Sequence, residues 1–216
     1  MFERSIRGVT PMSLQFIFDY RSPYAYLANS QLKTLPVPAE YISVDIVAVM
    51  DIVGNQPSPK CPAKARYSRM DAGRWARIYG VPMNPNAAAM QAMSSGQIEP
   101  DLFSRAALAA ADLGVFDTVH DALFTAYWGI PVDLATPEGR IAFLRANSVD
   151  ADIWQRAEEE DIRGRLSDNV TNAAQRGVFG APTFFVGDDM FFGNDRLAFV
   201  RDALAQNTLN EENHHE

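Results

Sequence analysis

The order of strand-forming and helix-forming stretches is the feature that most constrains the fold of this chain. Leu14–Phe18 (LQFIF) predicts a short buried strand, and residues 41–49 (YISVDIVAV), rich in β-branched side chains, predict a second one. Between them, Ser22 and Pro23 predict the start of a helix, because serine is a preferred N-cap and proline a preferred first helical residue. The chain therefore begins strand, helix, strand.

A long helical stretch follows. Apolar residues recur at helical spacing through most of residues 60–176. Gly80 and Pro82 end one of these helices, whereas the spacing over residues 102–127 predicts a single long helix that tolerates Gly114. We interpret the stretch as an all-helical insertion.

Strand character returns near the C-terminus. Thr183–Val186 (TFFV) and residues 190–192 flank a Gly-Asp-Asp turn and predict a hairpin, and residues 196–204 predict a closing helix. The whole order predicts an α/β fold with a thioredoxin-like core (β-α-β … β-β-α) and a large all-helical insertion. The expected division is a discontinuous core at residues 13–55 and 177–206, a helical insertion domain at residues 56–176, and flexible termini at residues 1–12 and 207–216.

Charge and cysteine content exclude several classes of function. A net charge of −8 repels phosphate backbones, so nucleic-acid binding is not expected. Cys61 is the only cysteine, which rules out an intramolecular disulfide and a cysteine-rich metal site. A single cysteine suits a reducing cytosol, although a cysteine-poor periplasmic protein would look the same. No stretch approaches the roughly 18 apolar residues that a membrane-spanning helix needs. We expect a cytoplasmic protein without a metal or a membrane anchor.

Histidine usage argues against a hydrolase. Of the three histidines, two lie in the C-terminal tail, and His120 falls within a helical stretch where a structural role is the simpler interpretation. The sequence has no G-x-S-x-G, H-E-x-x-H, P-loop or G-x-G-x-x-G motif. Neither a serine hydrolase nor a nucleotide-binding enzyme is therefore supported.

A combination of short segments carries a family resemblance. The segments are FDYRSPYAYLAN at residues 18–29, Gly54-Asn55, RWARIYGVP at residues 74–82, FGAPTFFV at residues 179–186 and FGNDRL at residues 192–197. Together they resemble the 2-hydroxychromene-2-carboxylate isomerase family over residues 13–205. That family is similar to the kappa-class glutathione transferases and, more remotely, to the DsbA-type oxidoreductases. The resemblance implies a glutathione-dependent cis–trans isomerase of aromatic catabolites that forms a homodimer.

Ser22 is the candidate catalytic residue. It caps the predicted first helix, where unpaired N–H groups and the helix dipole stabilise a thiolate. Redox relatives keep a cysteine here, and serine cannot replace its redox chemistry. The resemblance implies that glutathione brings the thiol, adds reversibly to the substrate and is regenerated, while Ser22 donates a hydrogen bond to its sulfur. From the Ser-Pro dipeptide alone, a simple helix cap would be the better interpretation.

The resemblance also implies the remaining site residues. Ala181 and Pro182 match the segment in which thioredoxin-type folds keep a cis proline beside the active site. The residues matching the glutathione site are Ser22, Ala181, Pro182, Phe192, Gly193, Asn194 and Asp195. Asp195 is expected to bind the α-amino group of the γ-glutamyl end. Asn55, Ser58 and Asn86 lie near family positions that bind a small aromatic carboxylate substrate, with a looser match.

Two rival functions stay open. A kappa-like glutathione transferase or peroxidase would consume glutathione, whereas an isomerase regenerates it. A non-catalytic thioredoxin-fold binding module is the other rival, because the redox cysteine is missing. Lys60, Lys64 and Arg74 could attract an anionic substrate, although such residues are more often solvated helix charges.

Overall fold

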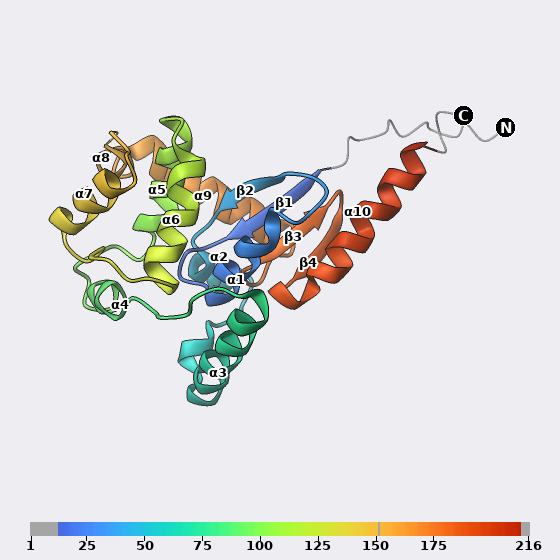
Figure 1. The fold of residues 1–216 in the computed structure, drawn as a ribbon, viewed down its shortest axis with the longest axis horizontal. Helices are drawn as coiled ribbons and strands as arrows, with labels where there is room; N and C mark the ends of the chain where they lie inside the picture. Colours follow the sequence, from blue (N-terminus) through green and yellow to red (C-terminus); the bar gives the residue numbers. More distant parts are fainter. Residues whose placement is uncertain (1–12, 151, 213–216) are drawn as a thin grey trace.

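One four-stranded sheet lies at the centre of the part of the chain that the computed structural model describes, residues 13–150 and 152–212 (Figure 1). The strands are β1 (Leu14–Phe18), β2 (Ala39–Ser43), β3 (Thr183–Val186) and β4 (Asp189–Phe192). Their order is β2-β1-β3-β4. β1 runs parallel to β2 and antiparallel to β3, and β4 is antiparallel to β3. The predicted β-α-β start and β-β-α end therefore meet through β1 and β3.

The apolar sequence of β1 reflects its place inside the sheet. Phe16 and Phe18 point into the larger hydrophobic cluster, which continues into the helices, whereas Ile17 points to the other face. There Ile17 belongs to a smaller cluster with Val170 and Phe185. Because both faces of the sheet are covered, β1 lacks the polar alternation of a half-exposed strand.

Helices make up most of the remaining described residues. They are α1 (Pro23–Leu32), α2 (Ile46–Ile52), α3 (Pro62–Tyr79), α4 (Ala87–Ser94), α5 (Leu102–Asp112), α6 (Phe116–Trp128), α7 (Pro137–Ala146), α8 (Ile153–Arg156), α9 (Glu160–Gln175) and α10 (Leu197–Glu212), with short 3-10 helices η1 (Ser58–Lys60) and η2 (Asn194–Arg196). In Figure 1, α4 to α8 gather at one end, α10 lies at the other, and α3 projects from the body. None of the helices in the described part is long and apolar enough to cross a membrane.

The predicted strand at residues 41–49 is wrong in its second half. β2 ends at Ser43, and α2 begins at Ile46. Asp45 is the reason, because its carboxylate accepts hydrogen bonds from the N–H groups of Val47 and Ala48 and caps a new helix. The β-branched residues that suggested a strand are buried or half-buried on this helix, since local capping outweighs a weak strand propensity.

Two helix boundaries also differ from expectation. The single helix predicted over residues 102–127 is two helices, because Gly114 takes a left-handed φ of 69° after α5 and starts the connection to α6. At the C-terminus, α10 runs to Glu212 instead of ending near residue 204. The expected flexible termini are otherwise untested, because residues 1–12 and 213–216 lie outside the described residues.

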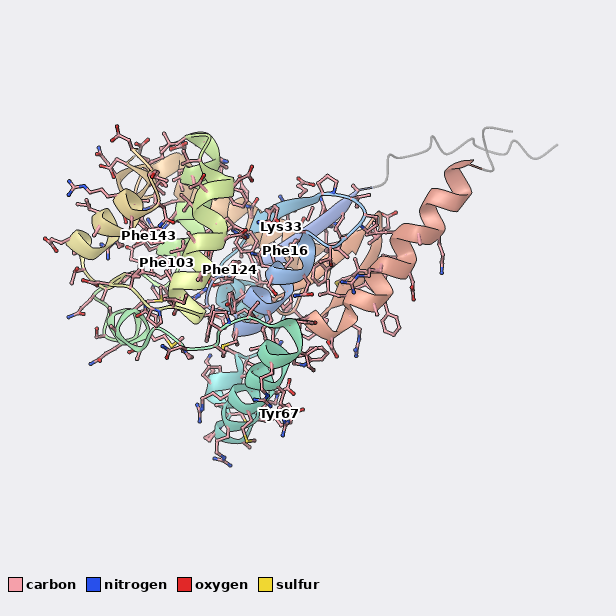
Figure 2. All side chains as sticks on the ribbon, viewed as in Figure 1. Phe16, Lys33, Tyr67, Phe103, Phe124 and Phe143 are labelled. Carbon is pink, nitrogen blue, oxygen red and sulfur yellow. The ribbon has the colours of Figure 1, made fainter. Side chains whose placement is uncertain are left out.

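The helices and the sheet share one main hydrophobic cluster. It runs from Phe16 and Phe184 on the sheet to Phe103, Phe124 and Phe143 in the helices. Figure 2 labels four of these rings, and they lie within the body of the molecule. On the other face of the sheet, α9 packs against α2 and β2. The predicted division of the chain into a core (residues 13–55 and 177–206) and a helical insertion (residues 56–176) stays a proposal.

Candidate active site

Ser22 joins the end of β1 to the start of α1. Its side-chain oxygen accepts a hydrogen bond from the N–H of Ala25 at 3.2 Å, which confirms the predicted N-cap. Its hydroxyl donates to the carbonyl oxygen of Ala181 at 2.8 Å. The residue is half-buried, and its one hydroxyl links two segments that lie far apart in the sequence.

A buried charge network fixes the turn that carries Ser22. The carboxylate of Asp19 accepts hydrogen bonds from the backbone N–H groups of Arg21 and Ile46. The Arg21 guanidinium bridges Asp19 and Asp45, with Nη2 at 2.5 Å from an oxygen of each. Burial alone would lower the pKa of Arg21, but the two carboxylates raise it above its ordinary value. Arg21 therefore stays charged and holds the Ser22 turn against the start of α2.

The segment opposite Ser22 has the predicted cis peptide bond between Ala181 and Pro182. The N–H of Gly193 donates to the carbonyl oxygen of Pro182 at 2.9 Å, so the turn after β4 is tied to this segment. Gly193 has a φ of 106°, and a Cβ there would lie 2.5 Å from Oδ1 of Asp195. Glycine is therefore required for the chain to pass this close to the Asp195 carboxylate.

α3 closes the frame around these segments. At its C-terminal end, the Tyr79 hydroxyl donates to the carbonyl oxygen of Asn194 at 3.2 Å. Near its middle, Asp71 accepts a hydrogen bond at 3.1 Å from the hydroxyl of Tyr24 on α1. Burial is the larger cause and the charge of Asp71 the smaller one, and together they raise the pKa of Tyr24 to about 12. This hydroxyl therefore keeps its proton near neutral pH. Ser22, the cis-proline segment, the Gly193 turn and α3 thus form one connected ring.

The predicted glutathione residues differ in their exposure. Asn194 is buried, and its side-chain amide donates to the Tyr79 hydroxyl oxygen at 3.4 Å. Asp195 is exposed and pairs with Arg196 at 2.6 Å. Phe192 is 41% exposed and its ring contacts that of Phe179, with centroids 4.5 Å apart. The part of the site near Asp195 therefore offers an accessible carboxylate and an accessible aromatic pair.

The three predicted substrate residues are placed differently. The Asn55 side chain donates to the carbonyl oxygen of Phe179 at 2.7 Å, which brings it to the cis-proline segment. Ser58 is exposed at the start of η1. Asn86 is 2% exposed, and its side chain caps α4 and donates to the carbonyl oxygens of Ala126 and Val132. These hydrogen bonds join Asn86 to α6 and to the segment that follows it, and its substrate contact stays a prediction.

His120 is held inside the protein by directed hydrogen bonds. Nδ1 lies 2.8 Å from the hydroxyl of Tyr20, and Nε2 lies 3.0 Å from Oδ1 of Asn29. Asn29 donates through its amide nitrogen to Asp121, so its oxygen is left to accept from Nε2–H, and Nδ1 accepts from Tyr20. Burial lowers the pKa of His120 to about 3. The neutral ring is a structural group, as the sequence suggested.

Several residues of the frame were not singled out from the sequence. Arg21, Tyr24 and Tyr79 lie in the segments that carry the family resemblance, but no side-chain role was assigned to them. The one available signal was their place beside Ser22 or in the RWARIYGVP segment. Asp71 had no such signal, because its partner Tyr24 is on another helix.

The chemistry of the polar groups at the site suits a thiol-bearing peptide. A helix N-terminus with a hydroxyl cap suits an anionic sulfur, and the exposed carboxylate of Asp195 suits an ammonium group. The carbonyl oxygen of Ala181 accepts the hydroxyl hydrogen of Ser22 directly. These donors and acceptors come from the core, and α3 borders them through Asp71 and Tyr79.

Comparisons with known proteins show the family to which this chain belongs. The family model of the DSBA-like thioredoxin domain matches residues 13–205. The chain is 31% identical over 211 residues to 2-hydroxychromene-2-carboxylate isomerase of Pseudomonas sp. (strain C18), covering 92% of this chain and 93% of that protein. It is 23% identical over 205 residues to glutathione S-transferase kappa 1 of Caenorhabditis elegans, covering 89% of this chain and 91% of the transferase.

A solved structure of 2-hydroxychromene-2-carboxylate isomerase has a similar fold. It superposes with a TM-score of 0.78 at 24% identity and covers 94% of this chain and 98% of the solved one. The thioredoxin-like core with added helices is thereby confirmed. From the family match and the identity over nearly its whole length, the chain belongs to the DSBA-like thioredoxin family and, within it, to the 2-hydroxychromene-2-carboxylate isomerases, a family of isomerase enzymes.

Proposed function

We propose that this chain is a glutathione-dependent cis–trans isomerase of 2-hydroxychromene-2-carboxylate-type aromatic catabolites. The observation that carries the proposal is the contact between Ser22, at the N-terminus of α1, and the carbonyl of Ala181. It places a hydroxyl with a movable hydrogen beside a helix end that favours a negative charge. The relatives named above supply the isomerase class and the aromatic carboxylate.

Glutathione, when bound, supplies a thiolate that can act as a nucleophile. Ser22 has one donor hydrogen, which is directed to Ala181 in this structure. Rotation about the Cβ–Oγ bond redirects that hydrogen toward a sulfur atom, while the Oγ lone pair still accepts from Ala25. Ser22 would thus hold a hydrogen bond to the thiolate and lower the pKa of the thiol.

The other residues of the site would bind and orient glutathione and the substrate. Asp195 would bind the ammonium group of the γ-glutamyl end through its exposed carboxylate, and Gly193 keeps the chain close enough for this. Ala181 and Pro182 would line the cysteinyl portion. Asn55, already tethered to Phe179, and Ser58 are kept as candidate substrate contacts, and Phe192 as an apolar wall. Asn86, which also caps α4, is kept as a third candidate substrate contact.

A kappa-like transferase or peroxidase is the second candidate, favoured by the similarity to the kappa transferase. The two differ in the fate of glutathione, which an isomerase regenerates and a transferase consumes. A non-catalytic binding module would show no turnover, whether or not it binds glutathione. We also keep the cytoplasmic location and the homodimer as proposals, the first because a lone cysteine suits a reducing compartment.

The test is an isomerisation assay on purified protein with 2-hydroxychromene-2-carboxylate, with and without glutathione. We expect turnover that requires glutathione, followed by recovery of all the glutathione as free thiol. Loss of one thiol per substrate converted would support the transferase instead. Full turnover without any thiol would contradict the role given to glutathione, and no turnover with measurable glutathione binding would favour the binding module.

A further inference from the structure

α3 and the residues just before it carry a concentration of positive charge in an acidic protein. Residues 60–77 hold six cationic side chains and one carboxylate, although the whole chain has a net charge of −8. The cations are Lys60, Lys64, Arg66, Arg69, Arg74 and Arg77, and all six are exposed. The carboxylate is Asp71, which accepts hydrogen bonds from the hydroxyls of Tyr24 and Tyr67.

Five of these six cations have no acidic partner within ion-pair distance in the described part of the chain. Among the ion pairs within the described residues, the one on α3 joins Arg74 to Asp71 at 3.9 Å, and the other five cations form none. An exposed and unpaired surface charge adds little to stability. It does create a potential that extends over about one Debye length, ~10 Å at 0.1 M salt.

The same helix forms one side of the candidate active site. Asp71 contacts Tyr24, two residues beyond Ser22, and Tyr79 contacts Asn194. The segment that leads into α3 contains Asn55, which contacts Phe179. Exposed apolar side chains lie among the charges, and Figure 2 shows one of them, Tyr67, on the projecting helix. An aromatic anion would therefore meet both attraction and apolar contact along this helix.

We propose that the basic stretch of residues 60–77 selects aromatic substrates that carry a carboxylate and attracts them to the active site. The inference rests on the proposed function, because it concerns the same site. Since the net charge of the chain is negative, a neutral aromatic compound gains nothing from this helix, whereas an anion is repelled by much of the protein and drawn to this part.

The first experiment compares two variants with the same change in net charge. Lys60→Gln/Lys64→Gln removes two unpaired cations from the basic stretch. Arg145→Gln/Arg165→Gln removes two cations from α7 and α9, of which Arg165 pairs with Asp112. At low salt, we expect the first variant to lower kcat/KM for 2-hydroxychromene-2-carboxylate by about threefold to tenfold, with kcat unchanged. The control variant should keep the wild-type value. The dependence of kcat/KM on salt should also be weaker in the first variant.

A binding experiment separates this inference from the proposed function. Benzylidenepyruvate and its neutral methyl ester can be titrated against wild type and both variants by quenching of tryptophan fluorescence, without any turnover. We expect Lys60→Gln/Lys64→Gln to weaken binding of the acid at low salt and not of the ester. Equal effects on acid and ester, or equal effects of the two variants, would overturn the inference even if the isomerase activity were confirmed. Absence of glutathione-dependent turnover would contradict the proposed function, and this titration would still decide the inference.

Discussion

The helical end of the molecule and the α3 helix use charged side chains in opposite ways. On α5, Arg105 is 0% exposed and pairs with Glu99, Asp101 and Glu158, and its guanidinium also donates to the carbonyl oxygen of Ala157. Near α8, Arg156 pairs with three carboxylates, which belong to Asp112, Glu159 and Asp161. Over residues 60–77, in contrast, five of the six cations have no ion-pair partner among the described residues.

The difference separates structural charge from available charge. A buried guanidinium must be paired and hydrogen-bonded, because burying an isolated charge is costly. Arg105 joins α5 to the segment around α8, and because it is fully buried it is not accessible to a ligand. The exposed cations of α3 have low structural value and remain available. The candidate active site lies between the core and α3.

The largest predicted effect is on stability, at Arg105. Arg105→Ala should lower the free energy of unfolding by about 3 kcal/mol, because it leaves a cavity and removes the donor to Ala157. Lys64→Ala, the matched surface change, should cost less than about 0.5 kcal/mol. Chemical denaturation monitored by tryptophan fluorescence measures both.

Arg105→Met refines this first comparison. It keeps most of the side-chain volume, and Glu99 and Glu158 are half-exposed, so these carboxylates can be rehydrated. We expect it to cost much less than Arg105→Ala. An equally large loss would mean that the charge network, and not packing, provides the stability.

The second prediction concerns Asp195, an exposed charge at the site. Asp195→Ala should weaken glutathione binding by roughly tenfold to a hundredfold, the usual loss for a charge-assisted hydrogen bond of about 1.5–3 kcal/mol. Because Asp195 pairs with Arg196 on the surface, its removal should change the free energy of unfolding little. Calorimetric titration gives the dissociation constant, with Asp188→Ala, an exposed turn residue, as the matched control. An unchanged constant in folded protein would remove Asp195 from the site.

The third prediction uses His120, a buried group shared by the core and the helices. In the unfolded chain the imidazole has a pKa of about 6.5, whereas burial lowers the pKa in the folded state to about 3. Between these values the unfolded chain binds the proton and the folded protein does not, so stability is lost as the pH falls from about 6.5 toward 3.

The expected size of the pH effect follows from the pKa difference. At pH 5 the loss at His120 should be about 2 kcal/mol relative to pH 7, from 1.36 kcal/mol for each pH unit below 6.5. Subtracting the same measurement on His120→Gln removes the contribution of other groups. Identical pH dependence in wild type and His120→Gln would show that the ring is not held neutral by burial.

Much of the fold was predictable because its signals are local. The Ser22-Pro23 helix start, the hairpin after Thr183 and the closing helix at Leu197 each depend on neighbouring residues, and each is present. The errors also have local causes. At Asp45 a cap turned a β-branched stretch into α2, and at Gly114 a left-handed residue divided a continuous apolar stripe.

The candidate site was only partly predictable. Ser22 and the Ala181–Pro182 segment could be named from the family resemblance, and the structure brings them into contact. The contacts between Tyr24 and Asp71, and between Tyr79 and Asn194, join residues 47 and 115 positions apart. Sequence periodicity carries no information on such pairs. Asn86 shows the opposite limit, since its residue type suits both a substrate contact and the helix cap that it forms.

The last prediction concerns the helix caps, and it compares the core with the helical end directly. Ser22 caps α1 through the N–H of Ala25, and Thr136 caps α7 through the N–H of Gly139. Ser22→Ala and Thr136→Ala should each lower the free energy of unfolding by about 1 kcal/mol. Only Ser22→Ala should slow glutathione-dependent turnover, since only this hydroxyl lies beside Ala181.

The distinction between a cap and a catalytic hydroxyl lies in the bound thiol. Ser22→Ala keeps α1 and its dipole, so glutathione should still bind, but its thiol should have a higher pKa than in wild type, because one hydrogen bond to the thiolate is gone. The ultraviolet absorbance of the thiolate in the binary complex measures this pKa. Thr136→Ala should leave it unchanged. The contrary result is a Ser22→Ala variant that loses only stability and keeps both the thiol pKa and the turnover of wild type. In that case Ser22 would be a helix cap like Thr136, without a role at the thiol.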